Sequence, residues 1–185
     1  EKKTSNAVIF FLMDISGSMG KTKKFLSRSF FFLIYHFIRS RYDKVDIAFV
    51  AYESEAYEVD EKSFFERGSS GGTIASTGIK MVNEIIDSRY HPSSWNIYTF
   101  HASDGDNWPT DNDSVREQME ICMPKVQFYG YCEIEPSTEK MGWLKESSLG
   151  TTFESMRYDK LRTSKISNKE DIWSAFNSFF KGELV

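Results

Sequence analysis

The chain has 185 residues, which is enough to bury one sizeable hydrophobic core and favours a single domain over residues 1–185. Its charged residues make up 27% of the sequence, carry a formal net charge of −4 and are interspersed in sign, so we expect no nucleic-acid partner. The longest apolar stretch, residues 30–38, is too short to cross a bilayer, and the first six residues lack a secretory signal pattern. These features favour a cytoplasmic protein without membrane association.

The two cysteines, Cys122 and Cys132, could in principle form a disulfide. Cys122 falls at the end of a predicted helix, and Cys132 falls at the end of a predicted strand. We therefore expect free, half-buried thiols in a reducing cytosol.

Strands and helices are predicted to alternate along the chain. Residues 7–13 form a continuous apolar run that is typical of a strand covered by helices on both faces, and a polar loop over 14–20 and a helix over 22–40 follow. Further strands are predicted at 45–52, 56–59, 95–102, 126–131 and 152–156, and further helices at 74–88, 114–123, 138–147 and 169–180. This order predicts an α/β, three-layer, Rossmann-like fold with a mostly parallel central sheet and helices on both faces. Ligands bind such sheets beyond the carboxyl ends of the strands.

The helix predicted over 22–40 is apolar around nearly its whole circumference. One interpretation is that it lies deep inside this domain. The other is that the chain is the carboxy-terminal part of a longer protein whose remaining part packs on this helix.

Hard oxygen ligands occur in three loops that each follow a predicted strand or precede a predicted helix. They are Asp14, Ser16, Ser18, Thr73 and Asp104. In the first loop, alternation turns the three polar side chains to one side while Ile15 packs inward. Hydroxyls, one or two carboxylates and retained waters suit Mg²⁺, with Mn²⁺ or Ca²⁺ as alternatives, although Ca²⁺ normally takes more carboxylates. The pattern therefore predicts a divalent-cation site.

Enzymatic alternatives fit the same residues less well. Gly20-Lys21-Thr22 resembles the end of a phosphate-binding P-loop, but Ile15 stands where that loop needs its first glycine. An aspartyl phosphatase needs a second carboxylate two residues after Asp14, where the chain has Ser16. We therefore predict that the chain is not an enzyme, and a metal-dependent phosphohydrolase or NTPase remains the alternative hypothesis. ATP or phosphoester turnover abolished by Asp14→Ala would favour that alternative.

Three segments resemble the metal-ion-dependent adhesion site of von Willebrand factor A domains in order and spacing. They are the Asp14-x-Ser16-x-Ser18 motif, the loop 71–73 (GGT) and the loop 103–105 (SDG). The resemblance implies that the hydroxyls of Ser16, Ser18 and Thr73 bind the metal directly, while Asp14 and Asp104 act largely through bound waters. It also implies an open coordination position that accepts an Asp or Glu carboxylate from a protein partner.

Four stretches are similar to the carboxy-terminal part of the bacterial YeaH/YhbH family: residues 58–65 (EVDEKSFF), 71–76 (GGTIAS), 95–98 (WNIY) and 102–108 (ASDGDNW). The chain departs from that family at 52–54, where a histidine-containing segment is usual, and at 100–101. The resemblance implies a long basic amino-terminal region in the whole protein. It further implies an association with a PrkA-type serine protein kinase and with stress or sporulation.

Asn107 and Trp108 follow the third loop, and we predict that they form the partner-binding rim of the site. Trp108 is either an exposed aromatic anchor or a side chain folded back onto the domain. Other aromatic side chains near the carboxyl end are predicted to be core residues because of their helical spacing: Trp143, Trp173, Phe176, Phe179 and Phe180.

Overall fold

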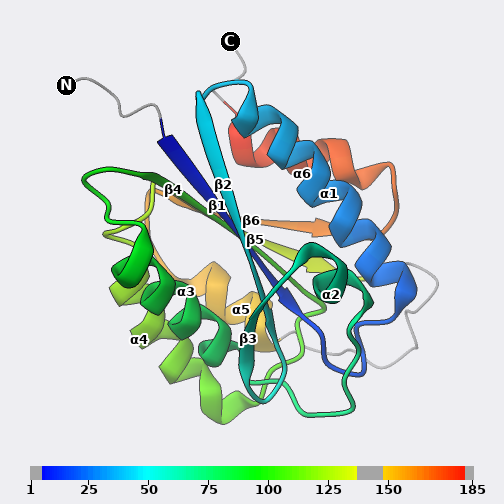
Figure 1. Ribbon diagram of the computed structural model, residues 1–185. Coiled ribbons are helices and arrows are strands. Elements are labelled where there is room, and N and C mark those ends of the chain that lie inside the picture. The colour runs from blue at the N-terminus through cyan, green and yellow to red at the C-terminus, as the bar shows by residue number, and fades with distance from the viewer. Residues whose placement is uncertain (1–5, 137–147, 182–185) are drawn as a thin grey trace.

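The computed structural model describes residues 6–136 and 148–181. Its strands are β1 (Asn6–Asp14), β2 (Lys44–Tyr52), β3 (Ala56–Val59), β4 (Asn96–Ser103), β5 (Phe128–Ile134) and β6 (Leu161–Ile166). Its α-helices are α1 (Lys21–Arg39), α2 (Glu61–Glu66), α3 (Ala75–Arg89), α4 (Asn112–Cys122), α5 (Ser148–Ser155) and α6 (Asp171–Phe180), and a 3₁₀ turn spans Pro109–Asp111. Figure 1 shows these elements packed around one central sheet.

The six described strands form one sheet in the order β3-β2-β1-β4-β5-β6. All neighbouring pairs are parallel except β2 and β3, which form an antiparallel hairpin at one edge. Strand order runs outward in opposite directions from β1 and β4, so these two strands flank the topological switch point. The carboxyl ends of β1 and β4 are therefore the expected position of a ligand site.

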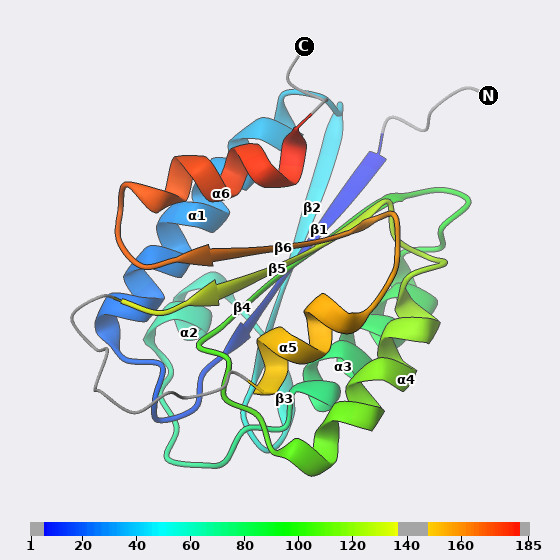
Figure 2. The ribbon, with the colours of Figure 1, turned by 180° about the vertical axis from the view of Figure 1, so that it is seen from behind.

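Helices cover both faces of the sheet, as Figures 1 and 2 show from opposite sides. On one face, α1, α2 and α6 pack through phenylalanines such as Phe31, Phe64 and Phe179 onto the sheet residues Phe11 and Phe100. On the other face, α3, α4 and α5 pack through aliphatic side chains and Phe153. The buried run from Ala7 to Met13 contributes alternately to both cores, which confirms the predicted doubly covered strand and the three-layer α/β fold.

Three parts of the predicted order are wrong. The predicted strand at 152–156 lies mostly in helix α5. Leu149 and Phe153 are four residues apart, so both are buried on the same face of this helix. Phe153 stacks on Tyr131, with 4.3 Å between the ring centroids. The strand that completes this edge of the sheet is β6, which the prediction missed because only its two end residues are buried. Helix α2 was also missed. The helix predicted at 138–147 and Trp143 lie outside the described residues.

Helix α1 is partly enclosed within the described chain. Helix α6 packs on it through Phe30 and Phe179, whose ring centroids lie 5.5 Å apart, and through Phe37 and Phe180, 4.4 Å apart. Phe32 nevertheless remains 64% exposed. Phe176, Phe179 and Phe180 are buried as predicted, whereas Trp173 is 58% exposed and was wrongly predicted as core.

Both cysteines are free and fully buried, deeper than the predicted half-buried state. Burial raises the pKa of the Cys122 thiol to about 12 and raises that of Cys132 further. Within residues 6–136 and 148–181, no helix combines the length and apolarity needed to cross a bilayer.

Candidate metal centre

The first loop of the candidate site continues directly from β1. Asp14 is the last residue of the strand and is paired with Tyr52 of β2, and the Ile15 amide still donates to the Tyr52 carbonyl at 2.8 Å. The chain then turns, because the Ser16 amide donates to Asp14 Oδ1 at 2.8 Å. Ile15 is fully buried, as expected, and the Ser16 and Ser18 hydroxyl oxygens lie 3.2 Å apart. Alternation thus brings the hydroxyls of the motif together.

The Asp14 carboxylate is fully buried, and one of its two oxygens has no hydrogen-bond partner. Its Oδ1 accepts the Ser16 amide, but its Oδ2 is buried and has no hydrogen-bond partner. Burial, together with the negative charges of Asp104 and Asp106, raises the pKa of Asp14 to about 7, although bonds from Ser16 oppose the shift. An unpartnered buried oxygen of this kind is costly unless something positive faces it.

Asp104 begins the third loop, immediately after β4. Asp104 Oδ1 accepts the Asp106 amide at 3.1 Å, and the turn depends on Gly105, whose φ of 85° lies in the region that favours glycine. Lys23 donates to Asp104 Oδ2 at 2.9 Å. Burial works against ionisation of Asp104, but hydrogen bonds from Ser18 and Lys23 and the Lys23 charge outweigh it, so the pKa of Asp104 is lowered. Asp104 therefore carries its charge at neutral pH.

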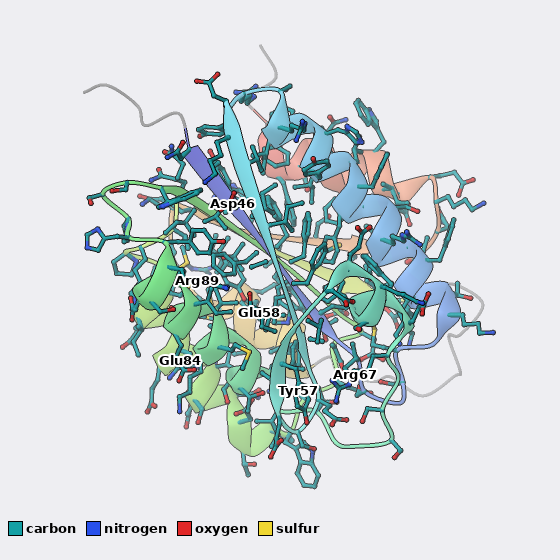
Figure 3. The ribbon with its side chains drawn as sticks, in the orientation of Figure 1. Asp46, Tyr57, Glu58, Arg67, Glu84 and Arg89 are labelled. Atoms are coloured by element: carbon teal, nitrogen blue, oxygen red, sulfur yellow. The ribbon has the colours of Figure 1, made fainter. Side chains whose placement is uncertain are left out.

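The second loop contacts both other loops. Thr73 is buried, and its carbonyl accepts the Trp108 amide at 3.3 Å, which joins it to the loop that Asp104 begins. A Cβ on Gly17 would lie only 3.3 Å from the Ser69 carbonyl oxygen, so the first loop passes close to the second. Arg67 anchors the start of this segment, since its guanidinium lies 4.2 Å from the Tyr57 ring centroid on β3 (Figure 3). The loops that carry all five predicted ligands therefore meet at the carboxyl end of the sheet.

The two predicted rim residues have different surroundings. Asn107 is tied into the structure: its Oδ1 accepts the Ala75 amide at the start of α3 at 3.0 Å, and its Nδ2 donates to Asn112 Oδ1 at 3.1 Å. Trp108 is 59% exposed, so its side chain is not buried in the domain core. Its indole nitrogen lies 2.8 Å from where a Cβ on Gly72 would be, which places the ring directly over the second loop.

A buried polar layer lies beneath the site, and sequence reasoning missed it. His101 of β4 accepts or donates at both ring nitrogens, to Tyr52 at 2.7 Å and to Tyr129 at 3.0 Å. Complete burial lowers the pKa of His101 to about 3, so the ring is neutral and carries one N–H. The layer therefore ties β2, β4 and β5 together just below the loops. The cross-strand register that creates it is not visible in the sequence.

Lys23 was missed as well. It lies in the first turn of α1, where a long side chain points back toward the amino end of the helix and hence toward the loops. The signal in the sequence that could have identified Lys23 as part of the site is its position five residues after Ser18.

The donor set fits a hard divalent cation. Within residues 6–136 and 148–181 no group of three or more His, Cys, Asp or Glu side chains could hold a metal, so a soft or carboxylate-rich site is not present there. Three hydroxyls and two carboxylates, one of which has an unpartnered buried oxygen, suit Mg²⁺, which takes few protein ligands and keeps several waters. Lys21 and Thr22, the residues of the P-loop alternative, are exposed at the start of α1.

Comparison with known sequences gives a consistent family match. The family model described as "Protein of unknown function (DUF444)" matches residues 1–183. A UPF0229 protein of Ruminiclostridium cellulolyticum is 43% identical over 178 residues, covering 94% of this chain and 43% of the relative. A UPF0229 protein of Pseudomonas syringae pv. syringae is 40% identical over 183 residues, covering 98% of this chain and 42% of the relative. The chain thus spans less than half the length of these curated relatives.

Solved structures show likeness of fold alone. The pilus adhesin SpaC from Lactobacillus rhamnosus GG, in an open conformation, superposes with a TM-score of 0.66 at 10% identity, covering 98% of this chain and 30% of the adhesin. An aerotolerance-related membrane protein from Bacteroides fragilis gives a TM-score of 0.59 at 11% identity, covering 95% of this chain and all of that protein. Both likenesses are consistent with a von Willebrand factor A-like fold.

Proposed function

The chain belongs to the family of UPF0229 (DUF444) proteins, and from that premise we propose that it is a protein-binding module that depends on a divalent cation, with Mg²⁺ as the preferred ion. Asp14, Ser16, Ser18, Thr73 and Asp104 hold the cation, and a protein partner completes its coordination with an Asp or Glu carboxylate. The bound ion supplies a concentrated positive charge at the end of the sheet. No catalytic step is part of this proposal.

The observation that carries the proposal is the open oxygen of Asp14. Asp14 Oδ2 is buried, unpartnered and lies at the topological switch point beside two adjacent hydroxyls and a second carboxylate loop. A cation beside it would remove the desolvation cost that raises the pKa of Asp14. A purely structural Ser/Gly turn accounts for the bond on Asp14 Oδ1, but it gives no reason to bury the second carboxylate oxygen without a partner.

A basic cleft next to the first loop supports an acidic partner. It has a volume of about 530 Å³, begins at Met19 and Gly20, and is lined by three cations, two phenylalanines and one acid: Lys21, Lys24, Arg28, Phe25, Phe65 and Glu66. The whole chain has a net charge of −4, so a cleft with three cations and one acid differs in sign from the average of the chain. An acidic segment with an apolar side chain would complement it.

The exposed Trp108 supports the same arrangement. An exposed tryptophan over the Gly72 loop offers a large apolar contact surface close to the cation. The similarity to the YeaH/YhbH family supports a further proposal, that the module serves a bacterial stress or sporulation protein linked to a PrkA-type serine kinase.

Isothermal titration tests the cation site. The EDTA-stripped chain is titrated with Mg²⁺ and with Mn²⁺, and we expect one equivalent to bind. The Asp14→Ala, Ser16→Ala double variant should bind none while keeping a folded circular dichroism spectrum. Asp113→Ala, which removes an exposed acid in the first turn of α4, is the matched control and should bind like the wild type. Lack of binding by the wild-type chain and by the longer family protein would refute the proposal.

Turnover separates this proposal from the alternative enzyme. ATP and p-nitrophenyl phosphate are incubated with the Mg²⁺-loaded protein, and we expect no hydrolysis above the level of the double variant. Hydrolysis that disappears in the double variant would replace the binding module by a metal-dependent phosphohydrolase or NTPase. Partners are then sought by capture in Mg²⁺ and release in EDTA, with the double variant as the control.

A further inference from the structure

Lys23 brings a positive charge of the chain itself into the candidate cation site. Its ammonium donates to Asp104 Oδ2 and to the Ser18 carbonyl, each at 2.9 Å, and so connects the first loop to the third. The contact is largely shielded from solvent, since the Lys23 side chain is 11% exposed and that of Asp104 is 4% exposed. An ion pair in this environment is screened far less by salt and water than a surface pair.

The two carboxylates of the site are consequently in different states. Both oxygens of Asp104 accept hydrogen bonds, one from Lys23 and one from the Asp106 amide. Asp14 has a hydrogen bond on Oδ1 and none on Oδ2. Lys23 therefore balances the charge of Asp104 and leaves Asp14 Oδ2 as the open oxygen.

We infer that Lys23 is a built-in competitor of the divalent cation, which occupies Asp104 in the metal-free protein and sets the metal affinity of the site below what its oxygen ligands alone would give. This inference rests on the proposed cation site. A cation drawn to Asp104 encounters an ammonium already bonded to that carboxylate. Like charges so close together in a shielded site repel strongly.

Bonds that do not involve Lys23 also hold the third loop in place. The Trp108 amide donates to the Thr73 carbonyl, Asn107 Oδ1 accepts the Ala75 amide at 3.0 Å, and the Leu149 amide donates to the Gly105 carbonyl at 3.2 Å. These bonds remain when the lysine is replaced. Loss of Lys23 therefore removes repulsion while the ligand oxygens stay in place, and competition outweighs any contribution of Lys23 to preorganisation.

The inference is tested by Mg²⁺ titration of Lys23→Met, with Lys62→Met on α2 as the control for the loss of one positive charge. We expect Lys23→Met to bind Mg²⁺ roughly tenfold more tightly than the wild type. Lys62 is exposed on α2, so Lys62→Met should change the affinity less than threefold. Lys23→Arg, which keeps the charge, should bind like the wild type.

Thermal denaturation in EDTA gives a second readout that does not need the metal. Lys23→Met should melt at a lower temperature than Lys62→Met, because Asp104 loses its counter-charge. Mg²⁺ should raise the melting temperature of Lys23→Met more than that of the wild type. If Lys23→Met does not fold without metal, Lys23→Gln keeps a hydrogen-bond donor and is titrated instead.

Equal or weaker Mg²⁺ binding by the neutral variants, with normal binding by the wild type, would overturn the role of Lys23 and leave the cation site standing. No binding by any variant would overturn both. Binding by Lys23→Met alone would support the competitor role and show that the wild-type site takes up metal only when Lys23 is displaced.

Discussion

Replacing a buried polar side chain usually lowers the stability of a protein. Replacing Asp14 by asparagine should have the opposite effect, because in the absence of metal the Asp14 carboxylate destabilises the fold. Burial and neighbouring acids raise the pKa of Asp14 from its ordinary value of 3.8 to about 7. Between these two values the folded protein holds a proton that the unfolded chain has lost. Raising the pH through this window therefore favours unfolding, and the stability contributed by protonated Asp14 is lost by about pH 7.

The size of the effect follows from the shift. At about 1.36 kcal/mol per pKa unit, the shift corresponds to roughly 4 kcal/mol of unfolding free energy between pH 4 and pH 8. Asparagine has no such pH dependence, although its unpartnered amide group carries a constant cost of about 1–3 kcal/mol. The difference in stability between Asp14→Asn and the wild type should therefore grow in favour of the variant as the pH rises from 4 to 7, and then level off.

Urea denaturation followed by tryptophan fluorescence in EDTA measures this difference at half-unit pH steps. Subtracting the wild-type curve from that of the variant cancels the titration of all groups the two proteins share. With saturating Mg²⁺ the trend should invert, since the wild type gains binding energy that the variant cannot. Wild-type Mg²⁺ affinity should also fall about tenfold per pH unit below pH 7, where metal must displace the proton. A difference in EDTA that stays flat from pH 4 to pH 8 would refute the reasoning about Asp14.

Three further substitutions test the supports of the site. Gly105→Ala forces a Cβ into a backbone with φ 85°, so we expect a loss of about 1–2 kcal/mol in urea denaturation, and an unchanged midpoint would contradict the assigned strain. Asp111→Ala removes the carboxylate that accepts the Ser76 amide at 3.0 Å in the first turn of α3. We expect a loss of about 1–2 kcal/mol of unfolding free energy in urea denaturation, and Asp113→Ala should show no such loss. Trp108→Ala should leave the melting temperature within a degree or two because the side chain is 59% exposed, yet reduce partner capture in Mg²⁺ several-fold; undiminished capture would remove Trp108 from the binding surface.

The sequence was sufficient to predict the parts of this fold that depend on local apolar patterns. The buried strands β1, β2 and β4 and the helices α1, α3 and α4 were each predicted to within about two residues, because long apolar or amphipathic runs leave little ambiguity. Strand β6 and helix α5 were not. β6 lies at a sheet edge, and only its residues Leu161 and Ile166 are buried. In α5, the adjacent threonines Thr151 and Thr152 are typical of a strand, and only the packing of Phe153 against the sheet favours a helix.

The position of the candidate site was predictable for a different reason, which is topological. Residues that follow neighbouring parallel strands lie at the same end of the sheet, regardless of the details of packing. Because β1 and β4 are parallel neighbours, Asp14 and Asp104 lie close to each other at that end. Charge balance within the site was not predictable in this way. It depends on a lysine rotamer at the start of α1, which directs the Lys23 ammonium at Asp104.

In the proposed site, strand order fixes where the loops with the ligand oxygens lie, whereas the proposed competition depends on the cation that the first turn of α1 directs at Asp104. A variant that moves the lysine by one residue, pairing Lys23→Met with Thr22→Lys, turns the ammonium by about 100° around the helix axis and away from the carboxylate. It should bind Mg²⁺ as tightly as Lys23→Met alone even though the net charge is that of the wild type. Wild-type affinity in this double variant would show that overall charge, and not the contact with Asp104, controls the site.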